Sequence, residues 1–411
     1  MFKSFFPRPR LFLITALAWV SLAVAVWYLS GEGMGAALGF AADAPDAEPM
    51  LGLSYFVTPS FIWFYLYCGA FLAVFAAAWF WLSPHPYQWW SIIGTALILF
   101  STYFSVQVSV AINNWRRPFF DDVQQALGGE STVTAGDLYA LILIFAQIAF
   151  LWVAIYVMTK FFVSHYIFRW RTAMNDYYMS RWPEVRSIEG ASQRVQEDTM
   201  RFATIMEDLG VSVVDAVMTL FAFLPVLALL SANVVELPVV GVIAEPLLFA
   251  AIFWSLFGTV LLALAGIKLP GLNFLNQRVE AAYRKELVYG EDDPVRAEPM
   301  TMRELFGQVR RNYFRMYFHY AYFNVFRGMY LQADNIFAYL ILIPTIAAGK
   351  ITFGILQQIL SAFGQVSSSF QYLVNSWSTI IELLSIQKRL AAFEAAFEGR
   401  ALPKIETEEA A

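Results

Sequence analysis

Charged side chains are scarce in this chain of 411 residues. Only 14% are Asp, Glu, Lys or Arg, whereas 59% are hydrophobic. About a quarter of the residues in an ordinary soluble domain are charged, so this composition argues against that class. No basic cluster exceeds a pair or two, and acidic residues are interleaved with the basic ones, which argues against nucleic-acid binding. We therefore expect a protein of the lipid bilayer that does not bind nucleic acid.

Cysteine and histidine are also nearly absent. The single cysteine, Cys68, lies in an apolar run and cannot form an intrachain disulfide. The three histidines, His85, His165 and His319, are far apart and lack a metal-ligand spacing. No nucleophile–base pair or cofactor loop is recognisable either. We predict no metal, no cofactor and no enzymatic activity.

A nucleotide-binding loop is missing as well. The nearest match is the run Gly349-Lys350-Ile351-Thr352. A Walker A loop would need Gly at position 344 and Ser or Thr at position 351, where this chain has Pro344 and Ile351. We therefore expect that this chain binds no nucleotide and does not hydrolyse ATP by itself.

Long apolar runs, in contrast, are abundant. A helix needs roughly 20 predominantly apolar residues to cross a bilayer. Eight runs qualify: Leu11–Leu29, Phe61–Leu82, Ser91–Ile112, Leu138–Met158, Val211–Ala232, Leu247–Ile267, Met329–Ala348 and Ile351–Ile381. The first is longer than the apolar core of a cleaved signal peptide, so we expect an uncleaved anchor. The sequence predicts an all-α polytopic membrane protein with eight transmembrane helices.

Positive charge is nearly absent from one side of these helices. When the runs are threaded alternately with the N-terminus inside, 24 of the 27 Lys and Arg residues fall on the inner side. Only Arg116, Arg117 and Lys350 fall outside. Basic residues favour the cytoplasmic side of membrane proteins. We therefore predict a multi-pass protein of the bacterial inner membrane with both termini in the cytoplasm.

The two long inner connections, 159–210 and 268–328, are rich in helix-forming residues. Six spans with helical extensions after the second and the fourth describe the transmembrane domain of ABC exporters. We expect three parts: residues 1–90 with membrane helices 1 and 2 and an outside loop, residues 91–398 as an ABC-exporter-like core without a nucleotide-binding domain, and residues 399–411 as a cytoplasmic tail.

A polar stripe marks the last apolar run. Its residues recur at steps of three and four, which places them on one helical face over about 36 Å. The stripe consists of Gln358, Ser361, Gln365, Ser368, Tyr372, Asn375, Thr379 and Glu382. Polar groups facing lipid are costly, so this face contacts protein or water. We favour the lining of a water-filled cavity, and a polar seam between helices is the alternative.

Carboxylates near or within the membrane are the second candidate group. Asp215 lies in the fifth apolar run and Asp334 in the seventh, where an ionised group is costly and tends to be functional or paired. A buried carboxyl group can also carry a proton near neutral pH.

The predicted cytoplasmic extensions add further glutamates. Glu197 is four residues from Arg201 and Glu280 four from Arg284, so surface ion pairs are an alternative interpretation for both. Glu207 differs, because no basic residue lies three or four positions away. Glu207 is therefore our first candidate for a proton-carrying group.

Several long motifs resemble the SbmA/BacA family of bacterial peptide transporters. They are Phe162–Asn175, Ile188–Ala191, Gln193–Phe202, Gly266–Leu272 and Asn276–Asp293, and the likeness extends from Met1 to Leu390. The resemblance implies an inner-membrane homodimer with an ABC-exporter-like core and no ATPase domain, which imports peptides, antimicrobial peptides included, with the proton gradient.

The resemblance also implies roles for individual residues. Glutamates along the cavity are implicated in proton coupling, and the matching positions here are Glu207 first, then Glu197, Glu280 and Glu291. Asp215 departs from the pattern, which has a neutral Asn there, and it is a further candidate. The expected partners are a second copy of the chain, peptide substrates, protons and the lipid bilayer.

Two other function classes stay open at this point. The chain could be the membrane half of an ATP-driven transporter of lipids or very-long-chain fatty acids, with its ATPase on a separate polypeptide. A membrane enzyme is disfavoured, because the sequence offers no catalytic constellation.

Overall fold

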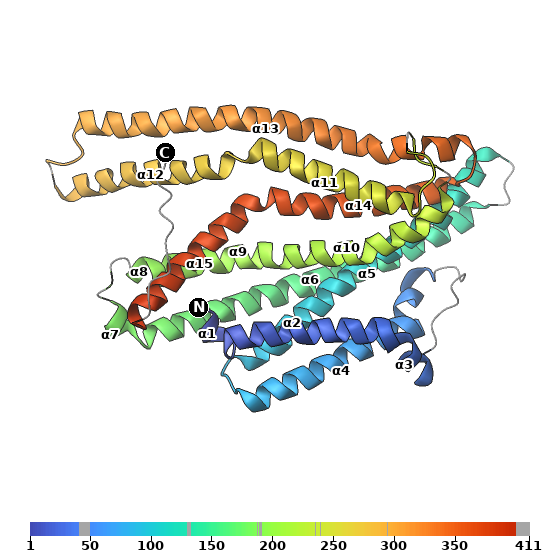
Figure 1. Cartoon of the computed structure of the whole chain (residues 1–411), viewed down its shortest axis with the longest axis horizontal. Helices are drawn as coiled ribbons and strands as arrows, with labels where there is room; N and C mark the ends of the chain where they lie inside the picture. Colours follow the sequence, from blue (N-terminus) through green and yellow to red (C-terminus); the bar gives the residue numbers. More distant parts are fainter. Residues whose placement is uncertain are drawn as a thin grey trace. The chain divides into compact units, whose positions relative to one another are not determined.

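The computed structural model describes residues 1–40, 50–129, 133–186, 188, 191–234, 236–238, 240–293 and 295–399. Within these ranges the protein is helical, and its one β-type pairing is an isolated antiparallel bridge between Leu237 and Gly241. The α-helices (Figure 1) are α1 (Phe2–Phe5), α2 (Pro9–Val26), α3 (Glu32–Ala37), α4 (Pro59–Leu82), α5 (Thr95–Gly128), α6 (Ala135–Met179), α7 (Trp182–Val185), α8 (Ala191–Gln193), α9 (Thr199–Ile205), α10 (Val211–Leu230), α11 (Pro246–Gly266), α12 (Leu269–Asp292), α13 (Pro299–Ala347), α14 (Phe353–Asn375) and α15 (Trp377–Phe397).

Seven helical segments in the described part are long and apolar enough to cross a membrane. They contain α2, α4, α5, α6, α10, α11 and α13, and they coincide with the first seven predicted runs. The protein is therefore a multi-pass, all-helical membrane protein. The eighth predicted run is helical too, as α14, but it is not among these seven segments.

Two of the spanning helices are far longer than a bilayer requires. Helix α6 has 45 residues and α13 has 49, against the roughly 20 needed to cross the hydrocarbon layer. Helix α6 opens with a capping box in which the Thr134 hydroxyl and the Asp137 carboxylate satisfy each other's backbone N–H groups. The predicted inner connections therefore begin or end as continuations of membrane helices. The predicted tail from residue 399 lies outside the described residues except for Gly399.

The chain forms two compact units. Unit 1 comprises Met1–Phe223, Thr352–Ala362 and Glu382–Ala411, and unit 2 comprises Leu224–Ile351 and Phe363–Ile381. The last helices, α14 and α15, thus supply residues to both units. No such division was predicted from the sequence.

The main core of unit 1 joins α1 with α15. Phe5 of α1 is fully buried and stacks on Trp170 of α6, with ring centroids 5.4 Å apart. Tyr178 of α6 and Leu390 of α15 are fully buried in the same cluster. Burying large aromatic side chains contributes strongly to stability. This core fixes α15 against α6 and α9.

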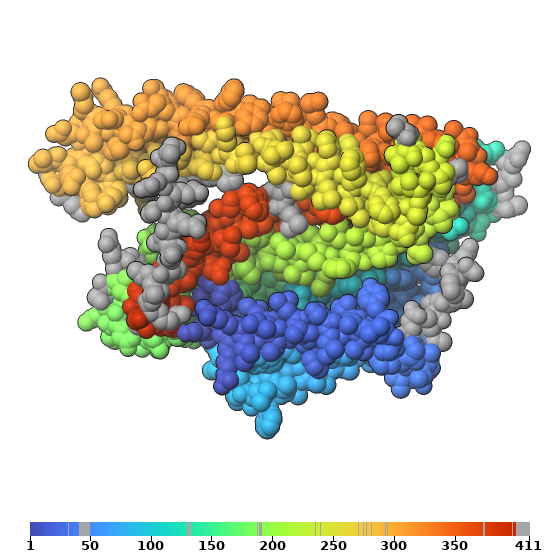
Figure 2. Space-filling model, in the orientation of Figure 1, coloured from blue at the N-terminus to red at the C-terminus, as the bar shows by residue number. Residues whose placement is uncertain are grey.

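In unit 2, α12 and α13 lie side by side and their side chains are in contact (Figure 2). Helix α11 also packs on α13, where Gly258 faces the ring of Tyr330. A Cβ atom there would lie 2.0 Å from Cζ of the buried Tyr330. Glycine is therefore required for this contact.

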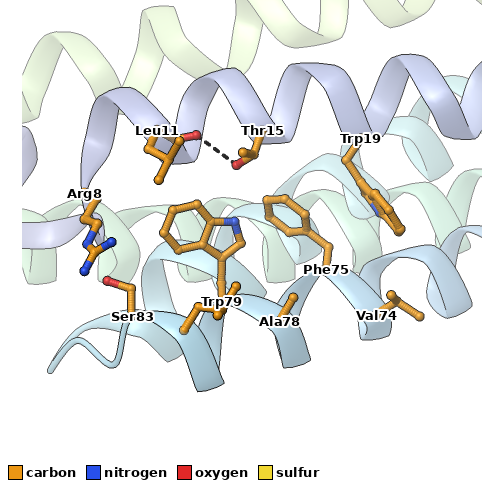
Figure 3. A pocket seen from close by; sticks show the side chains of 10 residues that line it. Arg8, Leu11, Thr15, Trp19, Val74, Phe75, Ala78, Trp79 and Ser83 are labelled. Carbon is orange, nitrogen blue, oxygen red and sulfur yellow. Dashed lines mark hydrogen bonds between the residues drawn. The ribbon is translucent and has the colours of Figure 1, made fainter.

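A pocket of about 340 Å³ lies between α2 and α4 in unit 1 (Figure 3). Its lining is mostly apolar, with Phe75 and Trp79 of α4 facing α2. The Thr15 hydroxyl donates to the Leu11 carbonyl at 2.9 Å, so it offers little to a ligand. None of the predicted site residues lines this pocket, so the candidate site lies elsewhere.

Candidate functional site

The first residue of the polar stripe lies in a helix–helix seam. Gln358 is 6% exposed and donates from Nε2 to Asn114 Oδ1 on α5 at 3.2 Å. Its backbone carbonyl accepts from Asn113 Nδ2 at 2.9 Å. Both asparagines belong to unit 1, as Gln358 does. At this end the stripe therefore follows the alternative interpretation, a polar seam between helices, in which amide groups hydrogen-bond across the contact.

The rest of the stripe on α14 is more accessible. Ser361, Gln365 and Tyr372 are partly exposed, and Ser368 and Asn375 are exposed. The Ser368 hydroxyl donates to the Gln365 carbonyl at 3.0 Å. This exposure fits a surface that contacts water, as a cavity lining would.

The stripe does not continue as one regular helix to Glu382. Residue Ser376 forms a turn between α14 and α15, and the chain bends there (Figure 1). Thr379 and Glu382 therefore lie on α15. The sequence predicted an unbroken run because no Pro or Gly lies near Ser376.

Arg201 brings two predicted site residues together. Its guanidinium lies 2.9 Å from Glu197 and 3.5 Å from Glu382, and all three residues belong to unit 1. The ion pair with Glu197 is the one predicted from the spacing of four. Glu382 is therefore one of a group of charged residues that includes Glu197.

The sequence did not predict the contact between Asp198 and Arg389, which lies next to this group. Asp198 is 2% exposed and accepts from Arg389 Nη2 at 2.7 Å and Nε at 3.1 Å. It also accepts from Arg194 Nη1 at 2.8 Å. The spacing of four between Arg194 and Asp198 was a visible signal, but Arg389 lies too far along the chain. This bidentate contact holds α15 against the segment that carries Glu197.

The two leading candidates for proton coupling, Glu207 and Glu197, lie in π-helical segments. Glu197 is in Arg194–Asp198 and Glu207 in Met206–Gly210. Single turns of π-helix within longer helices are frequent at functional sites. The wider turn changes the direction of the side chains relative to a regular α-helix, which sequence periodicity cannot anticipate.

Glu207 is partly exposed and has a neutral hydrogen-bond partner. The Ser164 hydroxyl on α6 donates to Glu207 Oε1 at 2.5 Å. The nearby Lys160 forms its ion pair with Asp208 instead, at 2.8 Å. No salt bridge to Glu207 occurs among the residues that the structure describes. The hydrogen-bond partner of Glu207 is therefore a neutral hydroxyl, and the salt bridge of Lys160 goes to the adjacent Asp208.

The remaining carboxylates are dispersed. Glu280, partly exposed, and Glu291, exposed, lie on α12 in unit 2. The ion pair considered for Glu280 and Arg284 is not formed in the described part of the chain, where Glu286 pairs with Arg296 at 3.5 Å.

Asp215 lies on α10 in unit 1, where its side chain is exposed. The structure therefore joins Glu197 with Glu382 through Arg201, while Glu280 and Glu291 belong to the other unit.

Asp334 is the centre of a polar cluster in unit 2. Its Oδ1 accepts from Trp254 Nε1 at 2.7 Å and from the Ser367 hydroxyl at 3.2 Å. Its Oδ2 accepts from Gln371 Nε2 at 3.4 Å. The sequence marked Asp334 as a carboxylate in a span, but it gave no indication of the neutral groups around it.

The chain is similar to several proteins named as ABC transporters. It is 23% identical over 344 residues to the inner membrane ABC transporter ATP-binding protein YddA of Escherichia coli (strain K12), which covers 78% of this chain and 60% of that protein. It is 24% identical over 246 residues to the chloroplastic ABC transporter D family member 2 of Arabidopsis thaliana, which covers 55% of this chain and 33% of that protein. The chain thus spans between a third and three fifths of the length of these relatives.

A family model covers most of this chain. The sequence model of the SbmA/BacA-like family matches residues 84–398, which include every predicted site residue. This match confirms the resemblance seen in the sequence. With the relatives and the spanning helices, it supports a multi-pass membrane transporter. The chain belongs to the SbmA/BacA-like family.

Proposed function

We propose that this protein imports peptides across the bacterial inner membrane, driven by the proton gradient. Cationic antimicrobial peptides and peptide-like antibiotics are the proposed substrates, and two copies of the chain work by alternating access. Family membership supports transport, and the accessible carboxylates and polar side chains fit a cationic, water-soluble cargo.

The proposed architecture has eight spans and both termini in the cytoplasm. Helices 1 and 2 (residues 1–90) precede an ABC-exporter-like core (residues 91–398), whose extensions at 159–210 and 268–328 lie in the cytoplasm. The length of α6 and α13 supports these extensions. Helix α14 is the proposed eighth span, because its 23 residues suffice to cross the bilayer and its polar face is accommodated by protein or water.

The environment of Glu207 is the observation that carries the proton-coupling proposal. A carboxylate that is paired with a cation stays ionised, whereas one with only a hydroxyl donor can gain and lose a proton at smaller cost. Glu207 accepts a hydrogen bond from the Ser164 hydroxyl and forms no salt bridge among the described residues, where Lys160 pairs with Asp208. Its segment leads directly into the membrane helix α10.

The proposed cycle follows from this arrangement. Glu207 gains a proton from the more acidic outer side, which changes the relative free energies of the outward- and inward-facing forms, so that proton and peptide move inward together before the proton leaves to the cytoplasm. Glu197, Glu280, Glu291 and Asp215 add negative charge along the path. Ser361, Gln365, Ser368, Tyr372 and Asn375 offer neutral hydrogen bonds to the peptide. Each proton adds about 2.3 kcal/mol per 100 mV of membrane potential to the driving force.

The experiment compares Glu207→Gln with Asp208→Asn in proteoliposomes with an imposed pH gradient and no nucleotide. Each variant removes one carboxylate at adjacent positions, but Glu207 is hydrogen-bonded to the Ser164 hydroxyl, whereas Asp208 forms the salt bridge with Lys160. We expect uptake of a cationic peptide to be lost in Glu207→Gln and retained in Asp208→Asn. Equal uptake by both variants would remove Glu207 from the mechanism. Uptake that required an added ATPase and ATP would instead support an ATP-driven half-transporter.

A further inference from the structure

Asp334 of α13 accepts hydrogen bonds from residues of two other helices, α11 and α14, and these residues are themselves fixed. Trp254 of α11 lies between two aromatic rings of α13, stacked on Phe337 with centroids 3.9 Å apart and on Tyr330 at 5.5 Å. Ser367 of α14 is 1% exposed. The two groups that donate to Oδ1 therefore have little freedom to turn away. A carboxylate with fixed donors in a membrane helix is a built site and not a chance contact.

The charge of this carboxylate is not neutralised by any nearby cation in the described part of the chain. Helix α11 contains no titratable side chain. On α13 the nearest ones are Tyr330, one turn away, and Arg327, which is exposed and forms no salt bridge with Asp334. On α14 the nearest is Tyr372. An ionised carboxylate at this place therefore relies on hydrogen bonds from neutral groups alone.

The same cluster can also hold the protonated acid. Both fixed donors, Trp254 and Ser367, address Oδ1, so Oδ2 is the oxygen left for a proton. Oδ2 faces the amide of Gln371 at 3.4 Å. A primary amide has an NH₂ donor and a carbonyl acceptor, and rotation by half a turn exchanges them. Gln371 can therefore donate to the carboxylate and accept from the carboxylic acid.

We propose that Asp334 is a second proton-binding residue of this transporter, held by Trp254, Ser367 and Gln371. The proposal rests on the proposed proton-driven function and adds a site within the membrane part of unit 2. Protonation of Oδ2 turns the Gln371 amide, which lies one residue before Tyr372 on the polar face of α14. Gain of a proton at Asp334 is thereby linked to the helix that carries the proposed cavity lining.

Infrared difference spectroscopy tests the site without any transport assay. Purified protein in lipid nanodiscs is titrated with acid, and the carbonyl stretch of protonated carboxyl groups is followed. We expect Asp334→Asn to lack one titrating component that the wild-type protein has. Trp254→Phe retains the carboxylate but removes a donor to its ionised form, so this component should titrate at higher pH. Trp377→Phe, at an exposed tryptophan of α15, is the control and should titrate as the wild type does.

Each outcome is decisive. An unchanged titration in Asp334→Asn would overturn the proposal, as would a component in Trp254→Phe that titrates at the wild-type pH. Because Trp254→Phe keeps the carboxylate, the second result is available even where Asp334→Asn does not fold. A wild-type protein that takes up no peptide under a pH gradient would refute the proposed function, while the titration of Asp334 would still be observed.

Discussion

Arg389 and Asp198, which are 191 residues apart, form a two-point contact: Nη2 lies 2.7 Å and Nε 3.1 Å from the two carboxylate oxygens. Asp198 is almost fully buried, and Arg194 is its other partner. The pair connects α15 with the π-helical segment that carries Glu197. It is the strongest charged contact around the proposed coupling residues.

Loss of this contact should lower stability measurably. In Arg389→Gln the buried carboxylate keeps Arg194 but has an unsatisfied oxygen, which costs about 2 kcal/mol. The midpoint of thermal unfolding of the purified protein in detergent measures this change. Lys388→Gln, at the exposed neighbouring position, is the control and should unfold like the wild type. Equal midpoints for the two variants would show that the contact does not stabilise α15.

Loss of the Arg201 side chain should lower stability less than loss of Arg389 does, although Arg201 contacts two carboxylates. Its side chain is 48% exposed, and those of Glu197 and Glu382 are 34% and 40% exposed. Exposed ion pairs contribute at most about 1 kcal/mol, because water screens the charges. We expect Arg201→Gln to unfold close to the wild-type midpoint in the same assay, and increasingly so at high salt. A loss as large as that of Arg389→Gln would contradict this ranking.

Gly258 should not tolerate even one methyl group. A Cβ atom there would overlap the ring of Tyr330, which is itself 2% exposed. Forcing α11 and α13 apart costs about 1–3 kcal/mol, so Gly258→Ala should lower the unfolding midpoint. Gly328→Ala is the control, because it makes the same change within α13 where no atom lies within 4 Å.

Combining Gly258→Ala with Tyr330→Ala tests whether the Tyr330 ring causes the loss of stability. Tyr330→Ala removes the ring that the new methyl group strikes, so its effect should be less than additive with that of Gly258→Ala. Additive losses would show that the ring is not what excludes a side chain at position 258.

His85 should make stability depend on pH. Burial lowers the pKa of this imidazole below its ordinary value of 6.5. Its Nδ1 accepts from the Tyr87 N–H at 3.2 Å, and Nε2 lies 3.3 Å from the Lys3 carbonyl, an arrangement that suits the neutral ring. The unfolded chain binds the proton more readily than the folded one. The stability that the neutral ring contributes is therefore present above pH 6.5 and is lost as the pH falls through the folded pKa.

The measurement is the unfolding midpoint of wild type and His85→Gln across this pH range. The wild type should lose stability on acidification by more than the variant does. Parallel curves for the two proteins would exclude His85 as the source.

The sequence predicted those parts of the structure that depend on near neighbours. Apolar runs located the spanning helices, and a spacing of four located the pair Glu197–Arg201, because these patterns are set within one helix. The contacts of Asp334 with Trp254, and of Glu207 with Ser164, join different helices. No local pattern encodes which helices meet, so the sequence named both carboxylates without their partners.

The polar stripe shows the same limit. Periodicity placed Gln358 and Ser368 on one face, but it could not tell what that face contacts. Gln358 turned out to lie in a seam with α5, whereas Ser368 is exposed. The bend at Ser376 was equally invisible, since the residues around it are compatible with a continuous helix.

Peptide uptake by wild-type protein in proteoliposomes, with a pH gradient as the sole energy source, tests the central claim most directly. The account predicts accumulation of a cationic peptide when the compartment from which it is taken up is the more acidic one, and none after a protonophore collapses the gradient. Accumulation that ignores the gradient, or that appears only with ATP and an added ATPase, would contradict it.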